Sequence, residues 1–517
     1  MPNNADHPMS ETRTSALAVP FLGVLASLQL IDPVVANTAL VKASQALEMH
    51  GATLALAAGI STLAQAATVL LMGFLGDRLE RRRVLMATLL LSIAGDGIAL
   101  AAPNANLFLL GRALAGIAVG GVLVLSFAAV RCVSRPNRLG KALGVWNLLI
   151  LAGLIAGSLL GGVLADSSWR LALGLVPLIA LLSLPLLPSL LPEMPANPEL
   201  RADWRGLVSI GGAMVLFLSG VSHAGNGFTS PAFLVPTLSG VALFGVHGLI
   251  ELNRQEPIFP VALYQRGGFM AAIVSGVAFN FAWAVVQLQT SNFWQLVQRY
   301  STGQVALAQL PLLLSAGVGV VVAGRVMRPG RRITQLVAAG MASLVIGLLL
   351  FGLVRADSSY SSLGFAMVLV GIGLGLISVP QAALFVQEAP PRSLGSVTAF
   401  RTTTGQLGFA LGFASSGAMV NGFGFASLRD RMLQLGSTPV QSHQLESLLR
   451  EALSGGGLSQ HSGAASNAIQ VMSEAYASGL AGTMVGVALI VGLLGAISLL
   501  LLVIGHRQQR TEESALA

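Results

Sequence analysis

The chain is poor in charge and in cysteine for its length. Only 10% of its 517 residues are Asp, Glu, Lys or Arg, whereas 54% are apolar, and the mean hydropathy is +0.77. Because about a quarter of the residues in soluble domains are charged, this scarcity excludes a soluble globular domain and indicates a polytopic membrane protein. The single cysteine, Cys132, excludes a disulfide within the chain and a zinc knuckle built from cysteines.

The sequence also lacks the residue patterns of several enzyme classes. It has no cluster of His, Cys and Asp at metal-ligand spacing, no P-loop that ends in Lys, and no paired carboxylates in a polar loop. We therefore expect no metal, no cofactor and no enzyme activity, and the missing P-loop argues against ATP-driven export. A nucleic-acid partner is not expected either, because the net charge of +8 is modest for this length and the cations gather at the ends of apolar segments.

Fourteen apolar segments reach the roughly 20 residues that a helix needs to cross a bilayer core of about 30 Å. They lie at 16–41, 52–76, 84–102, 106–130, 141–165, 169–192, 206–224, 231–250, 268–294, 306–326, 333–354, 361–386, 394–420 and 478–505. This six, two, six pattern predicts an all-α membrane protein with fourteen transmembrane helices. We expect one six-helix bundle at 16–192, a linker with two inserted helices at 193–255, and a second six-helix bundle at 256–505.

The distribution of Lys and Arg predicts the orientation in the membrane. Of the 29 cationic residues, 20 fall in loops on the side of the N-terminus and 7 on the other side. By the positive-inside rule, both termini (1–15 and 506–517) should be cytoplasmic in an inner (plasma) membrane. The first segment should anchor the chain, because residues 1–15 lack the pattern of a cleaved signal. The Gly- and Ser-rich stretch 421–477 should then form a mobile loop outside the membrane.

A charged run at 73–83 separates the second and third segments. It reads G-x-L-x-D-R-x-x-R-R, and its motif positions are Gly73, Asp77, Arg78, Arg81 and Arg82. The acid can pair with a cation across the bundle and so hold the cytoplasmic mouth closed. The alternative is that the arginines only fix the topology. A similar basic run at 324–332 follows the tenth segment, as expected of two parallel repeats.

Three charged residues inside the apolar segments are the candidate proton-coupling site. At ~1.5 Å per residue, Asp32 lies about 13 Å below the outer membrane surface, and Asp96 and Arg112 about 9 Å below it. The three side chains can therefore meet. Arg112 would keep one carboxylate ionised while burial favours the protonated form of the other, which could then load and release a proton. The alternative is a structural ion pair. Arg401, inside the thirteenth segment, could reach the cytoplasmic surface or bind an anionic group.

Polar side chains at helical spacing are the candidate substrate contacts. Asn280, Trp283 and Gln287 form one stripe on the ninth segment, and Gln65 belongs to another on the second. Such stripes face either a cavity or a neighbouring helix rather than lipid, and both alternatives remain open here.

Several further motifs occur in a fixed order along the chain. Residues 32–40 resemble the pattern D-x-T-V-V-N-V-A-L, Arg112 opens a stretch similar to R-x-x-Q-G, and residues 168–170 resemble a G-W-R segment. The fifth segment resembles the antiporter motif G-x8-G-x3-G-P-x-x-G-G, with Ser in place of Pro; its residues are Gly144, Gly153, Gly157, Ser158, Gly161 and Gly162. Together with the run at 73–83, these motifs resemble the major facilitator superfamily, and within it the fourteen-span drug:proton antiporter branch.

The resemblance implies a secondary active transporter that works as a monomer by alternating access. Its partners would be a small-molecule substrate, protons and the lipid bilayer, and its activity would be proton-coupled efflux of lipophilic or cationic compounds. Export of a metabolite such as an amino acid or siderophore, and facilitated transport without protons, remain alternatives, as does a receptor from another functional class. Because Ser158 replaces the proline of the antiporter motif, antiport itself is open.

Overall fold

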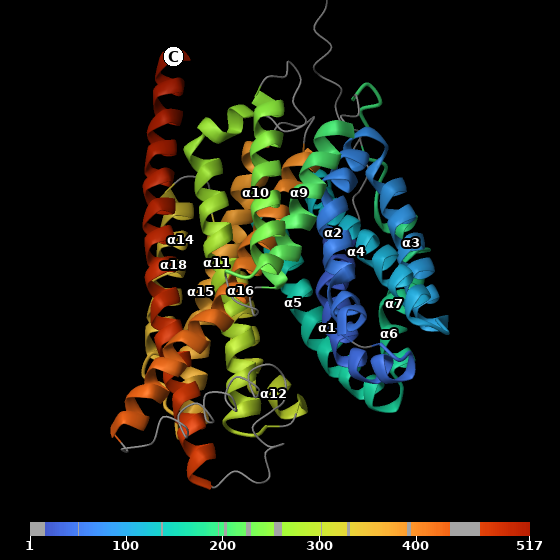
Figure 1. Ribbon diagram of the computed structural model, residues 1–517. Coiled ribbons are helices and arrows are strands. Elements are labelled where there is room, and N and C mark those ends of the chain that lie inside the picture. Colours follow the sequence, from blue (N-terminus) through green and yellow to red (C-terminus); the bar gives the residue numbers. More distant parts are fainter. Residues whose placement is uncertain are drawn as a thin grey trace, which may run out of the picture.

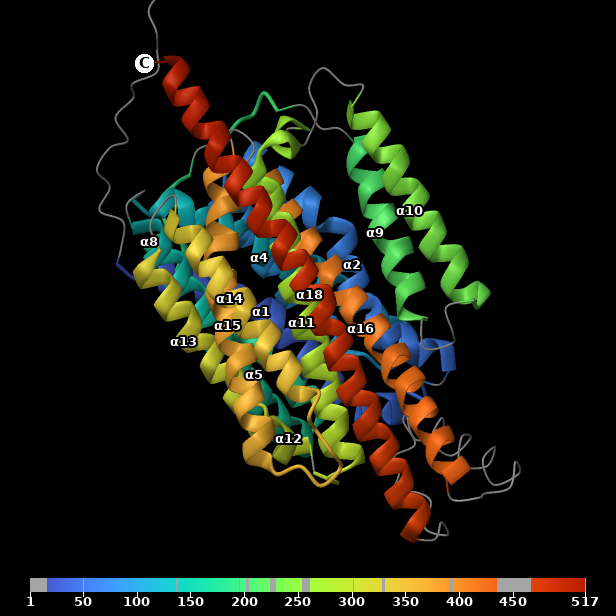
Figure 2. The same ribbon diagram turned by 90° about the vertical axis from the view of Figure 1, so that its left-hand side faces the viewer.

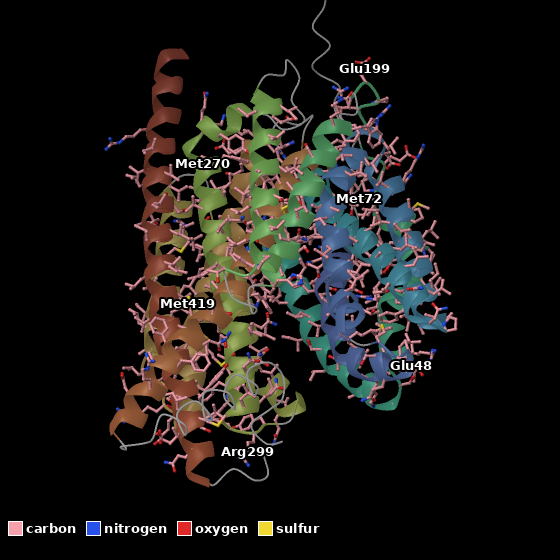
Figure 3. The ribbon with its side chains drawn as sticks, in the orientation of Figure 1. Glu48, Met72, Glu199, Met270, Arg299 and Met419 are labelled. Atoms are coloured by element: carbon pink, nitrogen blue, oxygen red, sulfur yellow. The ribbon has the colours of Figure 1, made fainter. Side chains whose placement is uncertain are left out.

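Figure 1 shows a computed structural model of the chain. The structure describes residues 16–49, 51–135, 138–194, 196–200, 204–223, 229–252, 261–300, 302–327, 331–389, 394–434 and 466–516. Glu199 and the C-terminus lie at one end of the bundle, and Glu48 and Arg299 lie at the other (Figures 1 and 3). We call the first the Asp77 end, because the carbonyl of Asp77 accepts a hydrogen bond from the N–H of Asn197, close to Glu199.

The N-terminal half begins with five long helices. They are α1 (Ala18–Ala46), α2 (Gly51–Arg78), α3 (Arg81–Ala101), α4 (Ala105–Val133) and α5 (Leu139–Ser167). The sixth predicted span, 169–192, is broken into α6 (Trp169–Leu173), α7 (Leu175–Ser183) and α8 (Leu187–Leu190). Gly174 separates α6 from α7, and Pro185 follows the end of α7, where its ring removes a backbone donor and prevents the helix from continuing.

The C-terminal half follows a short 3-10 helix, η3 (Val261–Gln265). Its helices are α11 (Gly267–Leu296), α12 (Thr302–Ala308), α13 (Leu310–Val326), α14 (Arg331–Phe351), α15 (Tyr360–Glu388), α16 (Leu394–Gln434) and α18 (Ser466–Leu516). The predicted span 306–326 is divided between α12 and α13, and Pro311 lies in the first turn of α13, where its missing N–H costs no hydrogen bond.

The predicted fold class is confirmed. Within the described residues, twelve helices are long and apolar enough to cross a membrane, and two shorter apolar helices, Trp169–Ser183 and Leu310–Val326, stand at the positions of the sixth and tenth predicted spans. Across the part of the chain that the structure describes, the protein is all-helical, and these helices are consistent with the fourteen expected membrane segments.

The predicted outer loop at 421–477 needs correction at both ends. Helix α16 continues to Gln434 and α18 begins at Ser466, so only the middle of the loop lies outside the described residues. The two helices stay together there because Gly479 and Gly482 let them approach: a side chain at Gly479 would meet the Val420 carbonyl at 2.5 Å, and one at Gly482 would meet the Phe423 ring at 2.8 Å.

The two inserted helices, α9 (Trp204–Ser222) and α10 (Pro231–Leu252), stand as a pair at the side of the bundle (Figure 2). Helix α9 packs on both α2 and α16. Its Leu207 is buried in a cluster with Phe74 of α2 and Ala399 of α16. The insert thus covers a seam where the N-terminal and C-terminal halves meet.

Contacts between the two halves occur at the Asp77 end. Helices α2 and α16 approach so closely that a side chain at Gly73 would meet the carbonyl of Gly395 at 2.5 Å. Arg131 of α4 donates to the carbonyl oxygens of Val386 and Ala389, the latter at 3.0 Å, at the end of α15. The structure is therefore a conformation in which backbone and side-chain contacts join the halves at this end.

Candidate functional site

A buried charge cluster joins three helices of the N-terminal half. Arg112 of α4 donates to both carboxylate oxygens of Asp32 of α1, at 2.6 and 2.8 Å. Its Nη1 also reaches Asp96 of α3 at 3.3 Å. The three residues are only 1–2% exposed. The structure thus brings together all three residues that the depth argument selected, and we call them the charge triad.

Two hydroxyl groups add hydrogen bonds to the carboxylates of the triad, whereas Nε of Arg112 is buried with no hydrogen-bond partner within the described residues. Ser61 of α2 donates to Asp32 at 2.9 Å, and Ser92 donates to Asp96 at 3.1 Å from one turn away on α3. Asp32 therefore accepts three hydrogen bonds, two of them from a guanidinium in the strong bidentate geometry, whereas Asp96 is held by two longer ones. The two carboxylates are held unequally.

Glycines explain why these helices approach closely enough for the triad to form. A side chain at Gly95 of α3 would lie 2.7 Å from the backbone nitrogen of Ala115, and one at Gly111 of α4 would lie 2.5 Å from that of Ala99. Gly116 packs directly on the backbone of Ser61. Any larger residue would push α3 or α2 away from α4, and Arg112 would then lose its partners.

The chemistry of the triad follows from its charge balance. With both carboxylates ionised, two negative charges face one guanidinium in a site without water access, and the excess charge is costly. One proton on either carboxylate makes the cluster neutral. An arrangement of two acids around one fixed cation can therefore take up and release a single proton.

Asp77 lies at the junction of the two halves. It forms a buried ion pair with Arg81 one turn later, and its Oδ1 accepts a hydrogen bond from the backbone N–H of Gly395, at the start of α16, at 2.9 Å. Arg81 also donates to Cys132 of α4 at 3.2 Å. The acid of the 73–83 run thus connects α2, α3 and α16.

The other arginines of this run have different surroundings. Arg82 pairs with Glu193 at 2.9 Å, in the segment that follows α8, and Arg83 pairs with Glu80 at 3.3 Å. Arg78 lines an open groove between α2, α3 and residues 196–198, and it has no ion pair within the described residues. The cation that pairs with Asp77 is therefore Arg81 of the same run and not, as expected, one across the bundle, where Asp77 meets the N–H of Gly395 instead.

The predicted substrate residues lie on α2 of the N-terminal half and α11 of the C-terminal half, and both helices pack on α16. Gln65 of α2 packs on Gly120 of α4, and its Nε2 is buried with no hydrogen-bond partner within the described residues. The same holds for Nε1 of Trp283 on α11. Asn280 lies against Gly405 of α16: a β-carbon added at Gly405 would be 3.4 Å from Nδ2 of Asn280. Gln287 lies nearer the end of α11, and its backbone carbonyl accepts a hydrogen bond from the side-chain Nε2 of Gln309.

Sequence reasoning missed one residue of this region. Both amide atoms of Gln406 on α16 are buried without a hydrogen-bond partner among the described residues, as are Nε2 of Gln65 and the indole nitrogen of Trp283. Leu407, next to it, packs against a cluster formed by Ala66 of α2 with Met214 and Leu218 of α9. Buried polar atoms without partners are rare in folded proteins and mark places for water or a ligand. The sequence signal was an amide in an apolar segment.

The glycines of the fifth segment form a packing stripe on α5. Side chains at Gly153, Gly157 and Gly161 would collide with α1: with Ser27, with Ile31 at 2.7 Å and with Val35 at 2.7 Å. Gly144 instead faces Gly324 of α13, and Gly162 has no neighbour within 4 Å. Ser158, at the position of the missing proline, donates to the carbonyl of Leu154 at 2.7 Å, and α5 continues as one helix through it.

The fold and this site define a polytopic membrane transporter: two helical halves in contact at one end, with a charged cluster buried inside one half. The chain belongs to the Major Facilitator Superfamily, whose family model matches residues 22–413. Proteins of this family are transporters of small molecules rather than enzymes.

Comparison with known proteins agrees with this assignment. The chain is 27% identical over 418 residues to the puromycin resistance protein pur8 of Streptomyces alboniger, covering 78% of this chain and 81% of that protein. It is 26% identical over 434 residues to the methylenomycin A resistance protein of Bacillus subtilis, covering 81% and 91%. Among solved structures, the proton:xylose symporter XylE has a similar fold, with a TM-score of 0.59, 13% identity and 94% of each chain covered.

Proposed function

We propose that the chain is a proton-coupled exporter of drug-like small molecules in the plasma membrane. It works as a monomer with both termini on the cytoplasmic side. Two relatives named for resistance to antibiotics support the class of substrate. The single observation that carries proton coupling is the charge triad, in which two buried carboxylates share one guanidinium.

In this proposal the triad couples proton movement to the arrangement of the N-terminal helices. A proton on Asp96 releases that carboxylate from Arg112 and leaves a neutral Arg112–Asp32 pair. Loss of the proton restores two negative charges, and Arg112 must then serve both acids. Because Asp32, Asp96 and Arg112 lie on α1, α3 and α4, each change alters the forces between these helices.

The gate is the second part of the proposal. In the described conformation, Asp77 binds the N–H of Gly395 and the guanidinium of Arg81, while Arg131 binds the end of α15. These bonds stabilise the closed cytoplasmic end. Opening toward the cytoplasm requires that they break, and substrate bound between the halves would be exposed when they do.

The substrate site is the region between α2, α11 and α16. It combines the unpartnered polar atoms of Gln65, Trp283 and Gln406 with apolar walls. A site with few polar groups and much apolar surface accepts many shapes, as expected of a drug exporter.

The experiment is transport by the purified protein in proteoliposomes. With an imposed pH gradient, the protein should accumulate dyes such as ethidium or drugs such as puromycin, and collapse of the gradient by an ionophore should stop accumulation. Transport of these compounds at the same rate without a gradient would leave a facilitator, and no transport of any of them would contradict drug export.

A further inference from the structure

Arg401 is a cation inside the C-terminal half that has no acidic partner among the residues the structure describes. Its Nε donates to Oε1 of Gln381 on α15 at 2.9 Å, and its guanidinium lies 4.5 Å from the ring centre of Phe127. Both partners are neutral. Arg112, by contrast, is paired with two acids. A cation within a membrane segment is costly unless it is paired, and such residues commonly mark a binding site.

The surroundings of Arg401 point to the substrate region rather than to the membrane surface. Gln381 lies against Gly276 of α11, where a side chain would meet its Nε2 at 2.6 Å. Asn280 donates to the carbonyl of the same Gly276 at 2.8 Å, and it faces Gly405, one turn after Arg401. Arg401, Gln381 and Asn280 thus form one contiguous polar group on three helices of the C-terminal half. The side chain of Arg401 does not extend toward the cytoplasmic surface.

The contact with Phe127 crosses the boundary between the halves. Phe127 belongs to α4 and packs on Trp146 of α5, so it moves with the N-terminal half. Only about a turn and a half separates Arg401 from Gly395, where Asp77 joins the halves. When the halves separate at this end, Arg401 loses its aromatic partner and is left with Gln381 alone. A guanidinium in that situation gains from an incoming carboxylate, which can accept two of its N–H groups.

We propose that Arg401, positioned by Gln381, is the anion subsite of the transporter, so that its substrates include amphipathic molecules that carry a carboxylate. The subsite becomes available when the cytoplasmic end opens, and it binds the carboxylate while the apolar part of the molecule lies between the halves. The inference deepens the proposed export function and rests on it for the direction of transport. Among compounds of similar shape, those that carry a carboxylate should therefore bind more tightly than their uncharged counterparts.

The test compares aryl carboxylates with their uncharged amides, for example dansylglycine and dansylglycinamide and larger homologues. Binding to the purified protein is measured by dansyl fluorescence without a pH gradient. In the wild type, at least one carboxylate should bind more tightly than its amide. Because a hydrogen bond to a charged group is worth about 1.5–3 kcal/mol, Arg401→Gln should raise the Kd of the carboxylate about tenfold or more and leave that of the amide unchanged.

Two further variants separate the subsite from a structural effect. Gln381→Glu keeps the size of the side chain but places a carboxylate beside Arg401, so it should also abolish the preference for the acid while the amide still binds. Arg355→Gln removes an exposed arginine from the same half and should change neither Kd. If Arg401→Gln does not fold, Gln381→Glu carries the test. Absence of any carboxylate preference in the wild type, including absence of binding, overturns the proposal, as does an equal loss for both ligands in the variants.

The outcome can be distinguished from failure of the proposed export function. Binding is measured at equilibrium and needs no pH gradient. If the protein prefers carboxylates but a pH gradient does not drive transport in proteoliposomes, the anion subsite is supported and proton coupling is rejected. If a pH gradient drives transport of dyes but the protein does not prefer carboxylates, the export function is supported and the anion subsite is rejected.

Discussion

Arg112 holds Asp32 with both terminal nitrogens, at 2.6 and 2.8 Å, but reaches Asp96 with only one, at 3.3 Å. The two acids of the triad are therefore not equivalent. The bidentate pair is the stronger contact and joins α1 to α4, whereas Asp96 can lose its bond to Arg112 with less cost. This asymmetry gives the triad a structural part and a part that can change its charge.

Removal of the shared cation should harm the protein more than removal of an acid. Arg112→Ala leaves two buried carboxylates without a counter-charge, and breaking a buried ion pair in this way costs about 3–5 kcal/mol. Asp96→Asn keeps the Arg112–Asp32 pair and should cost much less. Thermal unfolding of the purified variants in detergent checks the order. An Arg112→Ala protein as stable as Asp96→Asn would show that the triad does not hold the N-terminal helices together.

The packing of α5 on α1 should tolerate no side chain at Gly157. Its β-carbon would lie 2.7 Å from Ile31, so Gly157→Ala should lower the free energy of unfolding by about 1–3 kcal/mol through overpacking. Gly162→Ala is the matched control, because nothing lies within 4 Å of that position, and it should be neutral or slightly stabilising. Equal melting temperatures for the two variants would contradict the packing role of the glycine stripe.

Weakening the gate should expose the substrate region to the cytoplasm. Asp77→Asn removes the charge that binds Arg81 and weakens the bond from the Gly395 N–H, so the closed end should open about tenfold more often. On a Cys132→Ser background, a cysteine at Asn280 should then react faster with an impermeant thiol reagent applied from the cytoplasmic side.

Glu193→Gln provides the comparison for the gate variant. This substitution also removes an acid that pairs with an arginine of the run, Arg82, but one that is largely exposed and away from α16. It should leave the labelling rate at Asn280 unchanged. If Asp77→Asn labels no faster than Glu193→Gln, the run at 73–83 serves only to fix the topology.

The orientation can be tested with two exposed residues at opposite ends of the bundle. On the same Cys132→Ser background, Glu48→Cys should be labelled in intact cells by an impermeant reagent, and Glu199→Cys only after the membrane is permeabilised (Figure 3). The reverse pattern would place both termini outside and would overturn the reading of the loop charges.

The sequence predicted the helical class and the membrane segments well, because hydropathy and loop charge act along the chain and need no tertiary information. The residues at which helices break or end were harder to predict from the sequence. The extension of α16 to Gln434 depends on its packing against α18, which composition alone does not reveal. The same reason explains why the loop limits at 421–477 were too wide.

The triad shows which contacts can be predicted from the depth of each residue in the membrane and which cannot. Rise per residue placed Asp32, Asp96 and Arg112 at one level, and the glycines of α3 and α4 let the side chains meet. The unequal bonds to the two acids could not be predicted, since they depend on rotations of the helices. For the same reason, the partner of Asp77 could not be chosen between Arg78 and Arg81, and the inward position of Arg401 remained one of two alternatives.

The account depends most directly on the triad as the proton-coupling site. The decisive measurement is transport driven by a pH gradient in proteoliposomes that contain Asp96→Asn, which keeps the size of the side chain and the Arg112–Asp32 pair but removes the acid that takes up the proton. Asp357→Asn, at an exposed acid just before α15, is the control. The account predicts that the gradient no longer accelerates transport in Asp96→Asn, while substrate binding and the control remain as in the wild type. Gradient-driven rates in Asp96→Asn equal to those of the wild type would contradict it.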